Sequence, residues 1–92
     1  MDLFSQAVEK IVREQGNVIG PLALEQARQV NGLKIDLDKH QVSFSGDRTE
    51  ILDRLVAQYQ RIFGQASVQV CKDAVRPILS KLPPQEVPSL LR

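Results

Sequence analysis

The sequence is poor in the residues that build disulfides and metal sites. It has one cysteine and one histidine among 92 residues. An internal disulfide is therefore excluded, and so is the usual zinc set of three or four Cys and His ligands. The apolar runs are only a few residues long, whereas a membrane-spanning helix needs about 20. We expect no metal, no cofactor and no membrane insertion.

Charge of one sign is also lacking. Twelve Lys and Arg stand against 11 Asp and Glu, which gives a formal net charge of +1. Domains that bind nucleic acid usually carry a clear basic excess, so this balance disfavours a nucleic-acid partner. The first residues show no basic stretch followed by a long apolar segment, which predicts no secretory signal and a cytoplasmic location.

Motifs for catalysis are missing as well. The sequence has no glycine-rich phosphate loop and no nucleophile-elbow spacing. His40 has Asp36 and Asp38 nearby, but a turn histidine of this kind is typically solvated rather than a general base. Cys71 lies in an apolar stripe, which is typical of a packed thiol. We expect that the protein is not an enzyme.

Apolar residues that recur at three- and four-residue steps predict two helices in the first third of the chain. The first starts after Asp2, whose carboxylate can cap free N–H groups, and we expect it to end at Gly16. The second covers residues 21–30, because Pro21 loses no hydrogen bond at the first helical position.

Two longer helices are predicted in the second half. The third covers residues 48–63, with Asp47 and Glu50 spaced as a capping box and Gly64 at its end. The fourth begins near residue 66, and Pro77 inside its pattern predicts a kink or a restart. The proline pair at 83–84 stops it.

Between these pairs the period changes from helical to alternating. Residues 34–37 and 41–45 alternate apolar and polar side chains around a polar turn, which predicts a β-hairpin at 33–45. The predicted fold class is α+β, predominantly α, with four helices and one central hairpin. The predicted organisation is one domain, residues 1–82, followed by a proline-rich tail, residues 83–92. This tail is either a loose strap or a short docking turn.

The third and fourth helices carry wider apolar stripes than a small monomer easily covers. This surplus predicts a non-catalytic protein–protein interaction or regulatory module that associates with itself or with another protein. The expected core includes Leu22 and Ile62. The expected partner-binding residues are Val68, Val75, Leu79, Leu90 and Leu91.

An alternative is a winged-helix-like protein that binds nucleic acid. The order helix, helix, hairpin in residues 1–46 fits it, but that segment has five basic and six acidic residues, a net charge of −1. The residues that would contact phosphates are Arg28, Lys39, His40, Arg48, Arg54 and Arg61.

One short motif resembles a known family. The stretch Val18-Ile19-Gly20-Pro21-Leu22-Ala23 is similar to the Ile-Gly-Pro-x-Ala motif of small helical domains of unknown function in bacterial signalling proteins. The similarity covers residues 15–29. It implies a regulatory or interaction role without catalysis, and it carries over no functional residue.

Overall fold

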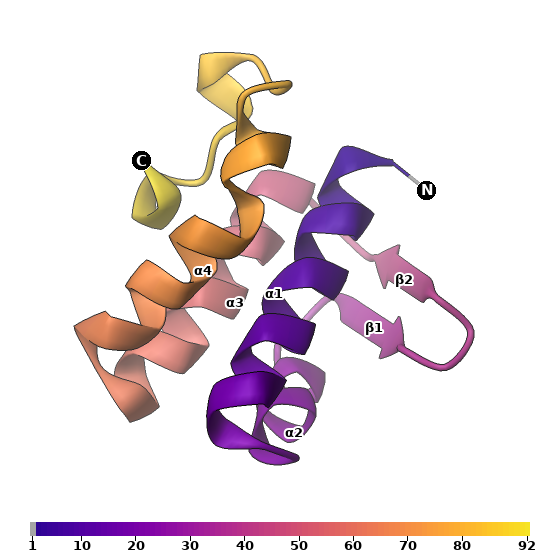
Figure 1. The fold of residues 1–92 in the computed structure, drawn as a ribbon. Coiled ribbons are helices and arrows are strands. Elements are labelled where there is room, and N and C mark those ends of the chain that lie inside the picture. Colours follow the sequence, from indigo (N-terminus) through magenta and orange to yellow (C-terminus); the bar gives the residue numbers. More distant parts are fainter. Residues whose placement is uncertain (1) are drawn as a thin grey trace.

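Four α-helices and one antiparallel hairpin make up the structure, a computed structural model that describes residues 2–92 (Figure 1). This content confirms the predicted fold class. The elements in chain order are α1 (Leu3–Ile19), α2 (Leu22–Arg28), β1 (Leu33–Asp36), β2 (Gln41–Phe44), α3 (Arg48–Phe63), α4 (Gln65–Leu79), and the short 3-10 turns η1 (Pro84–Glu86) and η2 (Ser89–Leu91).

Helix α1 lies in the middle of the fold. It packs against α4 along its length and against α2, and the hairpin lies on its other side (Figure 1). Helix α3 packs against α4 and α2. No helix formed by residues 2–92 is both long enough and apolar enough to cross a membrane.

Helix α1 begins as predicted but ends later. The Asp2 carboxylate accepts the Ser5 N–H at 2.8 Å, which caps the first turn. The predicted end at Gly16 is wrong, because the helix continues to Ile19 and stops at Gly20, whose φ is +70°. A glycine inside a helix costs only about 1 kcal/mol, and the positive φ at Gly20 ends the helix instead.

The bounds of the other three helices agree with the predicted bounds to differing degrees. Helix α3 spans the predicted residues, and the Asp47 carboxylate accepts the Glu50 N–H at 3.1 Å. Helix α2 is shorter than predicted and ends at Arg28. Of the kink or restart predicted at Pro77, the restart does not occur, since α4 continues to Leu79. A proline near the end of a helix interrupts only the last turn.

The hairpin has the predicted facing pairs. Leu33 is opposite Phe44 and Ile35 is opposite Val42. Leu33 and Ile35 are buried, while Val42 and Phe44 are half-buried against the core. The apolar face of the hairpin therefore rests on the helices, as an isolated two-stranded sheet requires.

The core is formed mainly by α1, α3 and α4, with contributions from α2 and β1. Tyr59 is its largest fully buried side chain. Two expected core residues, Leu22 and Ile62, are not in it: each is 45% exposed. They lie at the ends of their helices, where no other element covers them.

The tail is docked on the bundle. Residues 84–91 form two short turns, and η2 packs against α3 and α4. The Asp53 carboxylate on α3 accepts the Ser89 hydroxyl at 2.7 Å and the Leu90 N–H at 2.9 Å. Leu91 is 4% exposed and belongs to the core. The tail thus covers apolar surface of α3 and α4.

Candidate functional site

The predicted partner-binding residues do not form an exposed surface. Val68, Val75 and Leu91 are in the core of the single chain, and Leu79 and Leu90 are half-buried against it. The wide apolar stripes of α3 and α4 are covered by α1 and by the docked tail. Val68, Val75 and Leu91 therefore offer no exposed surface to a partner in the single chain.

Three other large apolar side chains are exposed among residues 2–92. They lie at the end of α1, at the start of α2 and near the end of α3, and their exposed fractions are 64%, 45% and 45%. We name this set the end patch; its members are Val18, Leu22 and Ile62.

Hydrogen bonds show that α2 and α3 run in opposite directions. Gln58 donates to the Gln26 side chain at 2.6 Å, and the Tyr59 hydroxyl donates to the Ala23 carbonyl oxygen at 2.6 Å. Leu22 lies one helical turn before Gln26 on α2, and Ile62 lies one helical turn after Gln58 on α3. These two members of the end patch are therefore at the same end of the α2–α3 pair.

Val18 lies at this end of the bundle too. Gln15 on α1 donates to the Ser67 carbonyl oxygen on α4 at 2.9 Å, so the last turn of α1 reaches the corner between α3 and α4. Phe63, the last residue of α3, is partly buried against the core at this corner. The three members of the end patch thus lie at the same end of the helical bundle.

A buried polar cluster connects α1 and α4. Gln15 is fully buried, and its Nε2 lies 3.3 Å from the Sγ of Cys71. Within residues 2–92, the Oε1 of Gln15 has no hydrogen-bond partner. Burial raises the pKa of Cys71 to about 11, so this thiol is protonated and enclosed at neutral pH.

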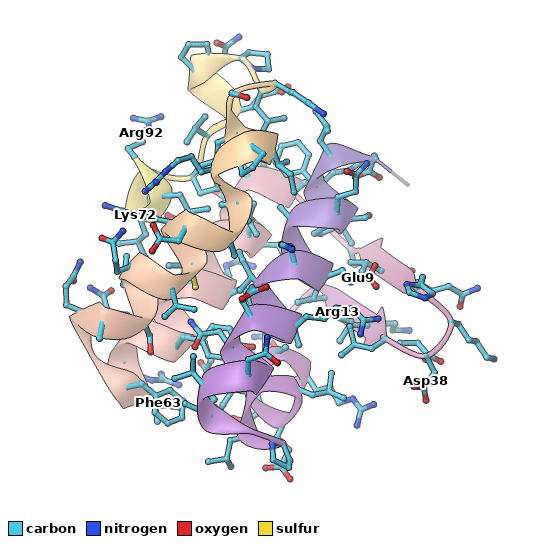
Figure 2. All side chains as sticks on the ribbon, viewed as in Figure 1. Glu9, Arg13, Asp38, Phe63, Lys72 and Arg92 are labelled. Carbon is cyan, nitrogen blue, oxygen red and sulfur yellow. The ribbon has the colours of Figure 1, made fainter. Side chains whose placement is uncertain are left out.

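Glu9 joins the hairpin turn to α1. Its Oε1 accepts a hydrogen bond from Arg13 at 2.9 Å and lies 2.6 Å from the Nδ1 of His40. Arg13 also donates to the Leu37 carbonyl oxygen at 3.1 Å, and Figure 2 shows Glu9 and Arg13 on the hairpin side of α1. Burial raises the pKa of Glu9, but the hydrogen bonds with Arg13 and His40 outweigh it, so the pKa is lowered overall.

Replacing Glu9 with glutamine is expected to reduce the free energy of unfolding at neutral pH by about 1 kcal/mol, because a charged acceptor is lost. The folded-state pKa lies below the ordinary value of 4.5. The stabilisation by the carboxylate is therefore complete above that value and is lost as the pH falls through the folded-state pKa. Urea titrations should show the difference between wild type and E9Q shrinking as the pH is lowered, and a constant difference would contradict this assignment.

The six basic residues proposed to contact nucleic acid do not form one continuous surface. Two lie at the hairpin turn, one at the end of α2 and three along α3. The hairpin turn and the C-terminal end of α3 lie on opposite sides of α1 (Figure 1). In that order they are Lys39, His40, Arg28, Arg48, Arg54 and Arg61. A strand of nucleic acid needs a connected basic stripe, which this arrangement does not provide.

Acidic partners also occupy several of these residues. Arg48 pairs with Asp2 at 3.4 Å, and its guanidinium lies 6.0 Å from the centre of the Phe44 ring. Arg54 lies 3.6 Å from Glu50, in a pair whose two side chains are largely exposed. Such an exposed pair contributes little to stability and opens easily.

Arg54 and Arg61 are the two that share a site. Both line a groove of about 640 Å³ between the end of α2 and α3. No carboxylate lines this groove, and its other polar side chains are four amides, those of Gln29, Asn31, Gln58 and Gln60. We name it the α2–α3 groove. Sequence reasoning paired Arg54 with Arg61 on one helix face but missed the amides of Gln29 and Asn31, just after α2, that complete the site.

A second groove, of about 630 Å³, lies between α1, α2 and the hairpin. Its charged side chains are already paired with each other or with neighbours. Lys10 lies 3.7 Å from Glu14, and Arg13 is bound to Glu9. It therefore offers no unbalanced charge to a ligand, unlike the α2–α3 groove.

Comparison of the chain with protein-family models, curated proteins and solved structures finds no match. Within residues 2–92, no three His, Cys, Asp or Glu side chains gather in a way that would hold a metal ion. The two surfaces whose composition favours a ligand are the apolar end patch and the basic, amide-rich α2–α3 groove.

Proposed function

We propose that the chain is a non-catalytic protein–protein interaction module that self-associates through the end patch. The observation that carries this proposal is the exposure of Val18, Leu22 and Ile62 together at one end of the bundle. Apolar side chains that gather on a surface gain free energy when a second apolar surface removes them from water.

A second copy of the chain is a suitable partner for this patch. A two-fold pair buries the same surface on both subunits, so one patch is enough to form a closed dimer. The net charge of +1 adds little repulsion between two copies. A contact centred on three large side chains is smaller than a standard stable interface, so we expect a dissociation constant of about 10–100 µM.

The local backbone supports this role of the patch. The Gly20 N–H donates to the Gly16 carbonyl oxygen at 2.9 Å, and Gly20 turns the chain sharply from α1 into α2. Val18 and Leu22 flank this turn and stay exposed. They lie in the stretch that resembles the motif of helical domains from signalling proteins, which agrees with a regulatory interaction. A cytoplasmic location is part of this proposal, because one cysteine leaves no disulfide framework.

Sedimentation over a range of concentrations tests self-association. The wild type should shift from a 10.3 kDa monomer towards a dimer as its concentration rises. The substitutions Val18→Glu and Ile62→Glu should each keep the protein monomeric, because a buried unpaired carboxylate opposes association.

The matched control is Gln41→Glu, which adds the same charge at an exposed position of β2, away from the end patch. It should dimerise as the wild type does. Circular dichroism should show the same helical content in all variants. A wild type that remains at 10.3 kDa up to about 500 µM overturns the self-association, because that is well above the expected dissociation constant.

A further inference from the structure

We propose that the α2–α3 groove binds an extended acidic segment of a partner protein. The groove is lined by side chains other than those of the end patch, so this inference goes beyond self-association and does not depend on it. It rests on the charge of the groove, the spacing of its arginines and the chemistry of its amides.

The charge of the groove is positive and incompletely balanced. The Arg61 guanidinium donates to the Gln58 side chain at 2.8 Å, and no ion pair of Arg61 is found within residues 2–92. Arg54 has Glu50 at 3.6 Å, in an exposed pair. A guanidinium binds a carboxylate with two parallel hydrogen bonds, so both arginines favour carboxylates on the ligand.

The spacing of the arginines fixes the form of the ligand. Arg54 and Arg61 are seven residues apart on one face of α3, and a rise of about 1.5 Å per residue separates them by about 10.5 Å. An extended peptide in the polyproline II form has three residues per turn and rises about 3.1 Å per residue, so residues three apart lie on the same face, about 9.3 Å apart. The segment that fits therefore carries Asp or Glu at positions i and i+3.

The amides of the groove suit a peptide backbone. Gln29 and Asn31 each carry an N–H donor and a carbonyl acceptor that can bond a peptide backbone. The Gln58 amide is bonded to Gln26 and Arg61, and the Gln60 N–H to Gln65, so a peptide would have to share or replace these contacts. Val30 and Ala57 add a small apolar surface to the lining of the groove. A volume of about 640 Å³ lies in the range of ordinary ligand sites.

The same lining disfavours a nucleic acid. Single-stranded DNA and RNA bind largely by stacking their bases on aromatic rings. No aromatic side chain lines this groove. Two arginines and four amides supply hydrogen bonds and charge but no aromatic stacking surface, which a peptide does not need.

A fluorescence anisotropy titration tests the proposal on the full chain. The probe is a fluorescein-labelled octapeptide, Gly-Ser-Glu-Thr-Val-Glu-Ser-Gly, and its control has glutamine in place of both glutamates. The acidic peptide should bind saturably and at least tenfold more tightly than its control. Arg54→Gln and Arg61→Gln should each weaken binding by about tenfold, the loss expected for one bidentate pair.

The matched control is Arg28→Gln, which removes the same charge from the end of α2 outside the groove lining. It should change the affinity by less than about twofold. Nuclear magnetic resonance gives a second readout: the side-chain amide signals of Gln29 and Gln58 should shift with peptide, and that of Gln41 on β2 should stay in place. This readout locates the peptide even where a variant folds poorly.

Three results would overturn the proposal. The first is equal affinity for the acidic peptide and its glutamine control. The second is an equal loss of peptide affinity in R28Q and R54Q. The third is that a twelve-nucleotide oligothymidylate binds more tightly than the acidic peptide, with an affinity that falls in R54Q and R61Q. The variant Val18→Glu separates this proposal from self-association. Peptide binding that persists in a monomeric V18E supports the groove alone, and its loss there overturns the independence of the two surfaces.

Discussion

Replacing Gly32 with alanine is expected to lower the free energy of unfolding by about 3 kcal/mol. Gly32 has a φ of +87°, which costs a residue with a side chain about 1–2 kcal/mol. An added Cβ would lie 2.7 Å from the Ser45 carbonyl oxygen and 3.0 Å from the Cδ1 of Ile51. The clash adds a cost of about 1–3 kcal/mol, because the contact is with backbone.

The backbone at Gly32 cannot easily move away. The Ser45 N–H donates to the Gly32 carbonyl oxygen at 2.7 Å and joins the two ends of the hairpin. The next residue, Leu33, is buried and begins β1. A shift at Gly32 would therefore disturb the hairpin and its packing on Ile51 together.

Gly16→Ala is the matched control, since it makes the same change inside α1. Nothing lies within 4 Å of a Cβ built at Gly16, and the backbone there is helical. Alanine should stabilise the fold by about 0.5–1 kcal/mol. Urea unfolding of both variants measures the two effects, and a G32A protein as stable as the wild type would contradict the close approach of Ser45.

The two glycines also show which helix ends could be predicted from sequence. Gly64 and Asp47 bracket α3 with local signals, a positive φ of +81° and a carboxylate cap, so the predicted bounds are confirmed. Gly16 looks like such a signal, but the half-buried Ile19 extends the apolar face of α1 by one more turn. Packing of this kind outweighs the modest helix penalty of glycine.

The covered faces could not be predicted in this way. A wide apolar stripe on α4 indicates that another segment packs against it, but it does not identify that segment. Here the cover is α1 and the tail, which Asp53 holds through Ser89 and Leu90, more than 30 residues away in sequence. The α2–α3 groove depends on a similar long-range contact, between Gln26 and Gln58. Periodicity reports only local neighbours.

Replacing Leu55 with alanine is expected to cost about 3–5 kcal/mol. Leu55 is fully buried on α3, so the substitution loses the transfer free energy of the side chain and leaves a cavity in the core. Domains of this kind have total stabilities of about 5–15 kcal/mol. Thermal unfolding should therefore show a midpoint lowered by about 15 °C or more, and urea titration should give the free energy directly.

Leu22→Ala is the matched control, because the same side-chain atoms are removed from a residue that is 45% exposed. Its unfolding free energy should change by less than about 1 kcal/mol, since surface truncations leave no cavity. Its dimerisation should weaken, because the end patch loses one of its three large side chains. A cost for L22A as large as that for L55A would mean that Leu22 is enclosed within one subunit, and self-association through the end patch would lose its basis.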